Sequence, residues 1–158
     1  YKHRLSIDEA TERLQGFYFP YHDKLKSLIK QTEASFNKVI LLDCHSMPLS
    51  SVNLARKKDP VEVVLGDCFG RSCEYEIVVE LKNLLTEVGF KVSLNNPFSG
   101  GFITKNYASP PNNINVVQIE ILRSLYSHEH QQIKNGEFAK IQSRLIGVIE
   151  EFIKRFAD

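Results

Sequence analysis

The stretch VILLDCHSMP, residues 39–48, begins with four consecutive apolar residues and continues into an acid, a thiol, an imidazole and a hydroxyl. An apolar run without polar alternation is typical of a strand that is covered on both faces of its sheet. We therefore predict a short buried strand from Lys38 to Asp43, with the reactive side chains of residues 43–46 at its carboxyl end.

Helical patterns precede this stretch. Apolar residues at helical spacing predict one helix over residues 7–17, with Ser6 or Asp8 as a cap, and a second helix over residues 25–36. Gly16 and Pro20 predict a break between the two helices.

Strand and helix patterns alternate after it. The apolar runs predict strands at 61–65, 90–94 and 116–122, and helices that carry apolar residues over 77–88, with Gly89 as the C-cap, and over 138–156. Polar loops are predicted at 50–60 and 95–113, and the length of the second is unusual for a loop without a function. This alternation favours a single α/β domain, residues 1–158, with a mixed, mostly parallel sheet flanked by helices.

The composition excludes several classes of partner. Lys and Arg number 20 against 19 Asp and Glu, so no global positive field favours nucleic acid or an anionic membrane. No apolar stretch approaches the roughly 20 residues that a membrane-spanning helix needs, and the opening residues YKHRLSIDEA lack the apolar region of a signal peptide. Three cysteines without a C-x-x-C pair fit a reducing compartment, so we expect a cytoplasmic protein.

Polar residues follow three of the predicted strands. His45 follows the first, Asp67 and Arg71 follow the second, and Asn95 and Asn96 follow the third. In open α/β sheets, ligands bind outside the carboxyl ends of the strands. We therefore expect these residues to gather at one edge of the sheet.

Glu120 differs because it lies inside a predicted strand, where it shares a face with Gln118 and Leu122. Burying a carboxylate costs several kcal/mol unless the group is paired or binds a metal. Glu120 is therefore a candidate catalytic residue. The alternative is a structural ion pair with Arg123 or Arg71.

Two further features favour a binding site. Arg71 follows a glycine and precedes a helix, so its guanidinium and free helix N–H groups could hold an anion such as a substrate carboxylate. A solvated Arg71, or one paired with Asp67, is an equally good interpretation. The pair Gly100-Gly101 permits positive φ or close backbone approach, which suggests a turn over a pocket.

His45 has three possible roles: a core histidine, a metal ligand, or a general base for Cys44 or Ser46. The last is disfavoured because adjacent residues of a strand point to opposite faces. A catalytic zinc needs three protein ligands, so one histidine does not make that site. We expect the other histidines at the surface; they are His3, His22, His128 and His130.

Four segments together resemble the motifs of a known family. They are LLDCHSMP (41–48), VVLGDCFGRSC (63–73), NNPFSGGFIT (95–104) and VQIEILRSLY (117–126). In their order and approximate spacing they resemble N-formylglutamate amidohydrolases, and residues 1–22 resemble that family's helical segment. The resemblance covers nearly the whole chain and is more specific than any single motif.

The resemblance implies a phosphorylase/hydrolase-like fold, related to zinc carboxypeptidases and aspartoacylases. It implies hydrolysis of N-formyl-L-glutamate, or of a related N-acyl amino acid, to formate and L-glutamate, a late step in one route of histidine breakdown. The substrate would be a small molecule with carboxylates. In this sequence His45 would be a Zn²⁺ ligand and Glu120 the general base and acid. Substrate-binding residues would be Arg71, Arg123, Asn95, Ser99 and Gly100.

The family's other two zinc ligands, in a Ser-Pro-His-Ser-Gly-type segment and at an acidic residue beyond it, precede the stretch with which this sequence begins. The chain opens at Tyr1 rather than Met, so we expect it to be the C-terminal part of a family domain. An alternative is a non-catalytic fragment or binding module that keeps an acidic-ligand pocket through Arg71 and Arg123. Hydrolysis through Cys44 or Cys73 ranks last.

Overall fold

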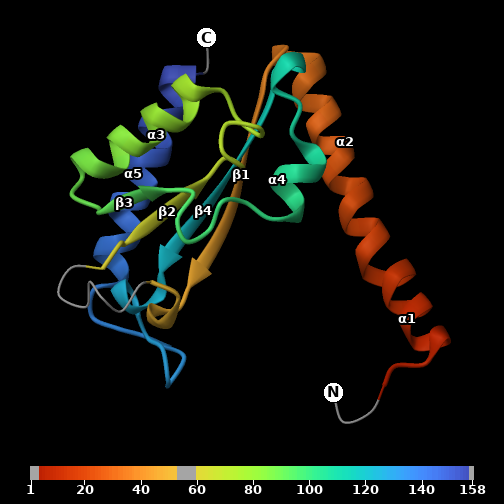
Figure 1. Ribbon diagram of the computed structural model, residues 1–158, viewed down its shortest axis with the longest axis horizontal. Coiled ribbons are helices and arrows are strands. Elements are labelled where there is room, and N and C mark those ends of the chain that lie inside the picture. Colours follow the sequence, from red (N-terminus) through yellow and green to blue (C-terminus); the bar gives the residue numbers. More distant parts are fainter. Residues whose placement is uncertain (1–3, 53–59, 157–158) are drawn as a thin grey trace. The chain divides into compact units, whose positions relative to one another are not determined.

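The computed structural model describes residues 4–52 and 60–156 (Figure 1). Most of the predicted polar loop at 50–60, and also His3, lie outside the described residues. Contacts between Cα atoms divide the chain into two compact units, Tyr1–Val39 and Ile40–Asp158. This division does not test independent folding, so a single domain over residues 1–158 stays a prediction.

The first unit is helical. It consists of α1 (Ile7–Arg13), a π-helical stretch (Leu14–Tyr18) and α2 (Phe19–Phe36). Ser6 caps α1: its hydroxyl accepts from the Glu9 amide at 3.1 Å, and its own amide donates to the Glu9 carboxylate at 2.9 Å. This reciprocal capping box confirms Ser6 as the start of the helix.

The predicted break near residues 16–20 is wrong, because the chain stays helical there. Pro20 lacks an N–H, and its ring would clash with the carbonyl four residues earlier in a regular α-helix. Around this point the Phe19 N–H bonds to the Leu14 carbonyl, five residues back, so the π-helical turn accommodates the proline.

The second unit is built on a four-stranded sheet. Its strands, in spatial order, are β1 (Val39–Met47), β4 (Ile114–Leu122), β2 (Val63–Gly66) and β3 (Val92–Leu94). β2 pairs with β3 in parallel and with β4 antiparallel, and β1 and β4 run in the same direction in Figure 1. The sheet is therefore mixed and mostly parallel, as predicted.

The remaining elements are mostly helical. They are α3 (Tyr75–Glu87), α4 (Phe102–Tyr107), α5 (Phe138–Phe156), the 3₁₀ turns Leu49–Ser51, Pro110–Asn112 and Arg123–Leu125, and the small hairpin of β5 (Ser127–His128) and β6 (Ile133–Lys134). The C-cap of α3 is Val88, and Gly89 follows it with φ of 86°, so the predicted helix end is confirmed one residue earlier. The prediction of one loop over 95–113 is wrong, because α4 and a 3₁₀ turn lie within it.

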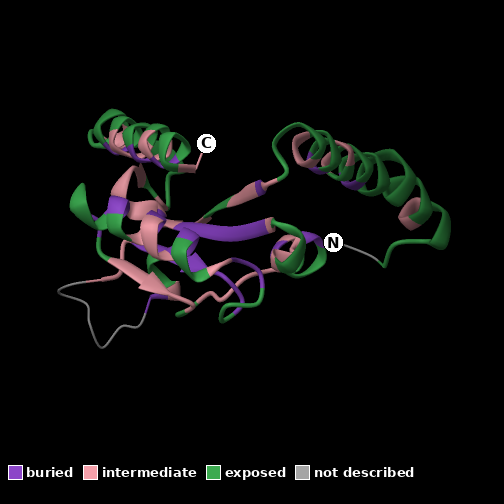
Figure 2. Ribbon diagram, turned by 90° about the horizontal axis from the view of Figure 1, so that it is seen from above, coloured by how far each residue is buried: buried purple, intermediate pink, exposed green. Residues whose placement is uncertain are grey.

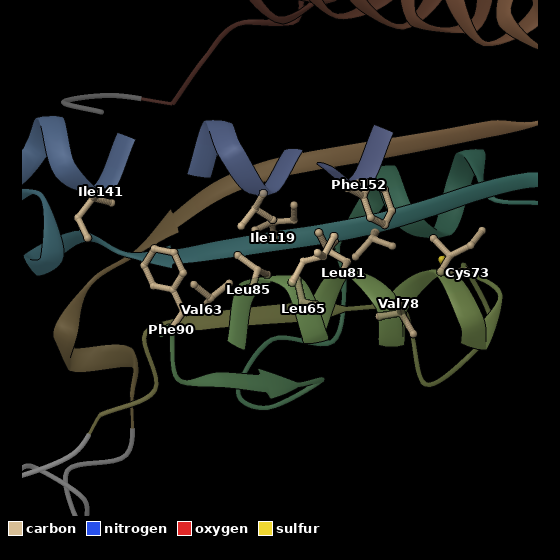
Figure 3. Packing of buried hydrophobic residues seen from close by; sticks show 14 residues of the cluster. Val63, Leu65, Cys73, Val78, Leu81, Leu85, Phe90, Ile119, Ile141 and Phe152 are labelled. Carbon is tan, nitrogen blue, oxygen red and sulfur yellow. The ribbon is translucent and has the colours of Figure 1, made fainter. Parts of the chain in front are cut away.

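The core lies mainly between the sheet and two helices. Val63 and Leu65 of β2 and Ile119 of β4 pack against α3 and α5 (Figure 3). A second, smaller cluster lies on the opposite face of the sheet and contains Val64 and Leu122. β4 is buried along most of its length and is largely purple in Figure 2.

β1 differs from its prediction in length. It extends to Met47, so His45 lies within the strand rather than after it. The predicted residues 38–43 are buried or half-buried, as expected, whereas Cys44 and His45 in the added part of the strand are exposed. β1 is an edge strand of the sheet formed by the described residues.

Candidate functional site

The polar residues of β1 lie on the sheet face away from α3 and α5. Ile40 and Leu42 pack against the core cluster that includes these helices, whereas Met47 belongs to the cluster on the opposite face. Because successive side chains alternate along a strand, Asp43 and His45 share the face of Met47.

The same face of the neighbouring strand carries the buried carboxylate. Gln118, Glu120 and Leu122 alternate along β4, and Leu122 packs in one cluster with Met47. β1 and β4 are neighbours in the sheet (Figure 1). The fold therefore brings the Asp43–His45 pair and Glu120 to one face of two adjacent strands.

Asp43 and His45 are in direct contact. The His45 Nε2 lies 2.9 Å from Asp43 Oδ1, and the two side chains are 48% and 15% exposed. A carboxylate on one ring nitrogen orients the ring and leaves Nδ1 as the nitrogen available to a ligand, an arrangement typical of metal-binding histidines. Strand alternation places the two residues on one face, and the structure adds their contact.

A complete zinc site is not formed by these residues. Within residues 4–52 and 60–156, no group of three or more His, Cys, Asp or Glu side chains could hold a metal ion. A catalytic zinc uses three protein ligands. Among the described residues, His45 with the supporting Asp43 carboxylate therefore fits one ligand of a zinc site. The other two ligands are not among these residues.

Glu120 is buried, and no cation among residues 4–52 and 60–156 pairs with it. It is 7% exposed, and its Oε1 accepts a hydrogen bond from Gln118 Nε2 at 2.8 Å. Arg123 instead donates to the Ser46 carbonyl at 3.2 Å, and Glu120 forms no ion pair with any described residue. The structural ion pair with Arg123 or Arg71 considered above is therefore wrong, and the catalytic role of Glu120 stays a prediction.

A glycine-containing loop crosses the same face beside Gln118. Gly66 of β2 pairs with Gln118, and a Cβ at Gly66 would lie 2.7 Å from the Gly100 nitrogen. Gly100 has φ of 129°, and a Cβ there would lie 2.6 Å from Thr104 Oγ1. The predicted close approach at Gly100-Gly101 is thus present over the sheet face, next to the Gln118–Glu120 pair.

Asn95 holds the ends of two strands together. It adopts φ of 56°, and its Nδ2 donates to Asp67 Oδ1 at 2.6 Å. Its Oδ1 accepts from the backbone amides of Asp67 at 3.1 Å and Phe69 at 3.4 Å. The side chain that was predicted to bind substrate is therefore engaged in fixing the loops after β2 and β3.

Arg71 lies in the turn before α3 and is exposed. It forms no ion pair with a described residue, so its pairing with Asp67, the alternative above, is wrong. An exposed guanidinium without a protein carboxylate can still take an anionic ligand.

The predicted gathering of polar residues at one edge is wrong. Because β4 is antiparallel to β2, the carboxyl ends of β2 and β3 lie at one edge and those of β1 and β4 at the other. His45 therefore lies toward the opposite end of the sheet from Asp67 and Asn95. Glu120, paired with Val64 in the middle of β2, lies between the two ends.

The cysteines are poorly placed for nucleophilic catalysis. Partial desolvation raises the pKa of the Cys44 thiol, and the Asp43 carboxylate raises it further. A raised pKa reduces the thiolate fraction. Cys73 is 1% exposed within the core. These positions do not support hydrolysis through either residue.

The other described histidines divide into two groups. His128 and His130 are exposed, as predicted. His22 is buried, so its predicted surface position is wrong: its ring lies 4.2 Å from that of Tyr18 and 5.0 Å from that of Tyr21. Helical spacing alone does not predict aromatic contacts of this kind.

A cavity of about 420 Å³ lies on the other face of the sheet, against α5. Its walls are mainly apolar and include Ile121, Tyr126, Phe138, Ile141, Leu145 and Ile149. An apolar cavity does not compensate the desolvation of carboxylates, so it does not suit the charged substrate that the sequence suggests.

Comparison with known proteins identifies the family. Residues 1–127 match the model of the N-formylglutamate amidohydrolase family. The chain belongs to this family.

The two relatives described next are longer than this chain. It is 31% identical over 125 residues to the N-formylglutamate deformylase of Pseudomonas putida and 28% identical over 125 residues to that of Pseudomonas aeruginosa. The matches cover 78% of this chain but 46% and 47% of those proteins. The chain therefore spans about half the length of these N-formylglutamate deformylases.

Solved structures agree with the family. The crystal structure of the N-formylglutamate amidohydrolase from Ralstonia eutropha JMP134 matches 98% of this chain, and 57% of that one, with a TM-score of 0.88 and 32% identity. A gene product of Agrobacterium tumefaciens shares the fold, with a TM-score of 0.67 and 22% identity over 96% of this chain and 55% of that one. The α/β fold is thus that of an N-formylglutamate amidohydrolase.

The structure adds one polar residue that sequence reasoning left without a role. Gln118 holds Glu120 and lies beside the Ser99–Gly101 loop. The signal that could have found it is its position two residues before a buried carboxylate in the same strand, which places both side chains on one face.

Proposed function

We propose that the whole protein hydrolyses N-formyl-L-glutamate, or a related N-acyl amino acid, to formate and L-glutamate, with zinc as its cofactor. One observation carries the proposal: Glu120 is buried without a cation among the described residues, on the sheet face that also carries the Asp43–His45 pair. The names of the relatives and the family match supply the reaction class.

Glu120 is the proposed general base and acid. It takes a proton from the attacking water and passes it to the departing amine nitrogen, so the carboxylate is regenerated after each turnover. Gln118 restricts the orientation of the carboxylate through its 2.8 Å hydrogen bond. A carboxylate held in one orientation can contact both the water and the leaving nitrogen without a large side-chain movement.

His45 is proposed as one zinc ligand, through Nδ1, with Asp43 orienting the ring. The other ligands are proposed to lie outside the described residues. Zinc bound there would polarise the formyl carbonyl and lower the pKa of bound water toward about 7.

Arg71 or Arg123 is proposed to hold a substrate carboxylate; the two lie toward opposite ends of the sheet, because they follow the antiparallel strands β2 and β4. Arg71 is exposed and has no ion pair among the described residues, whereas Arg123 is held by Ser46. Arginine binds carboxylates in a defined geometry, and binding at these groups would position the formyl carbon. Asn95, Ser99 and Gly100 are proposed to line the pocket, and we expect the protein in the cytoplasm.

The test is Glu120→Gln in the whole protein. We expect formate release from N-formyl-L-glutamate to fall by about 10²–10⁴-fold, because proton transfer is lost, while zinc content stays unchanged. Glu76→Gln, at an exposed position in the first turn of α3, is the matched control.

Undiminished turnover in Glu120→Gln would refute the role of Glu120. Glutamate binding by the wild-type protein, measured by calorimetry without zinc and without formate release, would instead identify a binding module.

A further inference from the structure

A polar cavity of about 490 Å³ lies at the carboxyl end of β4, beside the β5–β6 hairpin. Two cations, Arg123 and Lys134, are among its walls, and no described Asp or Glu lines it. The acid of the hairpin, Glu129, instead accepts a hydrogen bond from the Leu49 amide at 3.0 Å. The described lining of this cavity is therefore positively charged.

Neither cation is neutralised by a described carboxylate. Arg123 donates to the Ser46 carbonyl at 3.2 Å and to the Ser46 hydroxyl at 3.3 Å, and both acceptors are uncharged. The Lys134 ammonium lies 3.9 Å from the centroid of the Phe138 ring. Neither side chain forms an ion pair with a described residue. An anion in this cavity would be attracted by both charges.

Hydrogen bonds of the backbone and of small polar side chains keep the two cations at one cavity. Lys134 pairs with Ser127 across the hairpin, and the Ser127 hydroxyl donates to the Arg123 carbonyl at 3.2 Å. Next to Lys134, the Asn135 Nδ2 donates to the Ser124 carbonyl at 3.2 Å. The hairpin is thus fastened to the turn that carries Arg123.

The polar cavity adjoins the apolar cavity of about 420 Å³ against α5. Tyr126 and Phe138 line both of them. Phe138 is the first residue of α5, and the apolar cavity follows this helix as far as Glu150. An α-helix rises about 1.5 Å per residue, so the apolar walls extend for about 18 Å from the cationic end. We call the two cavities together the α5 groove.

The two ends of the α5 groove carry opposite charges. Arg123 and Lys134 lie at one end, and Glu150 lies at the other. A ligand with a single carboxylate can place it at the cations and its apolar part along the helix. A second carboxylate would enter an apolar cavity or approach the like charge of Glu150, and both are unfavourable. The groove therefore favours a monocarboxylate with an apolar body.

We infer that the α5 groove binds a small monocarboxylate with an apolar body, with its carboxylate at Arg123 and Lys134. This goes beyond the proposed hydrolysis. Strand alternation places Ser46, the partner of Arg123, on the opposite sheet face from His45, so the ligand occupies a second site. In this assignment Arg123 serves the α5 groove, and Arg71 keeps the proposed role toward the substrate carboxylate.

Calorimetry on the whole protein tests the inference with three carboxylates. Octanoate has one carboxylate and an apolar chain, acetate lacks the chain, and suberate has the same chain length with a carboxylate at each end. We expect octanoate to bind about 10–100-fold more tightly than acetate, because its methylene groups leave water. Suberate should bind more weakly than octanoate, because its second carboxylate loses hydration.

Ile146→Asn tests the apolar part of the groove. Ile146 lines the apolar cavity and is 50% exposed, so its replacement leaves the core intact. Octanoate affinity should fall by about 3–10-fold and acetate affinity should stay unchanged. Ile153→Asn is the matched control, because Ile153 also lies on α5 and is 57% exposed but does not line the cavity.

Lys134→Gln tests the cationic end. Lys134 is exposed, so its loss does not disturb folding. The affinities for octanoate and acetate should both fall by about 2–5-fold, the effect of one partly exposed charge. Lys30→Gln, at an exposed position of α2, should bind both compounds as the wild type does.

Three results would overturn the inference. The first is equal affinity for octanoate and acetate, or octanoate binding that neither Ile146→Asn nor Lys134→Gln weakens. The second is octanoate that raises KM for N-formyl-L-glutamate without changing kcat, which would place it in the substrate site. The third is no octanoate binding together with altered sedimentation of Ile146→Asn, which would show that a protein surface covers the groove.

Discussion

Asn95 and Asp67 are joined by two hydrogen bonds of opposite direction. The Asn95 Nδ2 donates to Asp67 Oδ1 at 2.6 Å, and the Asn95 Oδ1 accepts from the Asp67 amide at 3.1 Å. Asp67 is 6% exposed. The pair therefore ties the loop after β3 to the loop after β2 and supplies the buried carboxylate with a donor.

Asn95→Ala should destabilise the protein by about 2–4 kcal/mol, because it removes both bonds and leaves a buried carboxylate without its donor. Urea unfolding of the whole protein measures the change. Asn113→Ala is the control: Asn113 has φ of 59°, close to the 56° of Asn95, but lies exposed. The two variants share the backbone cost of alanine at positive φ, so equal losses of stability would contradict the structural role of the Asn95 side chain.

Gly66→Ala tests the close approach of the loop to the sheet. Its Cβ would lie 2.7 Å from both the Gly100 nitrogen and the Ser99 carbonyl carbon, which are backbone atoms and cannot rotate away. We expect a loss of about 1–3 kcal/mol in the free energy of unfolding, as for other overpacked sites. Thermal and urea unfolding of the variant provide the measurement.

Gly147→Ala is the matched control for this substitution. Gly147 lies inside α5, and a Cβ there would meet no atom within 4 Å. Alanine favours helix over glycine by about 1 kcal/mol, so this variant should be more stable than the wild type. A Gly66→Ala protein as stable as Gly147→Ala would show that the loop does not lie over Gly66.

Most helices and strands of the second unit could be predicted because the spacing of their apolar residues is regular. The run that ends at Leu122 and the helical spacing from Phe138 to Phe156 each identified an element close to its observed bounds. Gly89 identified the end of α3, since few other residues adopt its positive φ without strain. These signals are local, and tertiary packing agrees with them.

The direction of the strands and the contacts of individual side chains could not be predicted from these local sequence patterns. The alternation around Glu120 shows which residues share a face but not whether β4 runs with or against β2, so the edge that His45 approaches was placed wrongly. α4 was missed because Gly101 and the polar residues around it are typical of a loop. The unpaired Gln118 oxygen depends on neighbours from another part of the chain.

The 2.9 Å contact between Asp43 and His45 leads to the last prediction, which concerns metal affinity rather than turnover. If His45 binds zinc through Nδ1, the Asp43 carboxylate fixes the ring and increases its basicity. Removing such a supporting carboxylate typically lowers metal affinity by about 10–100-fold. Asp43→Asn should therefore weaken zinc binding by that factor in the whole protein, measured by competition with a chromophoric chelator. His45→Ala should weaken it further, because a ligand itself is lost. Asp23→Asn, on the exposed surface of α2, should bind zinc as the wild type does. Unchanged affinity in both Asp43→Asn and His45→Ala would remove His45 from the zinc site and leave the Asp43–His45 pair as a structural contact of β1.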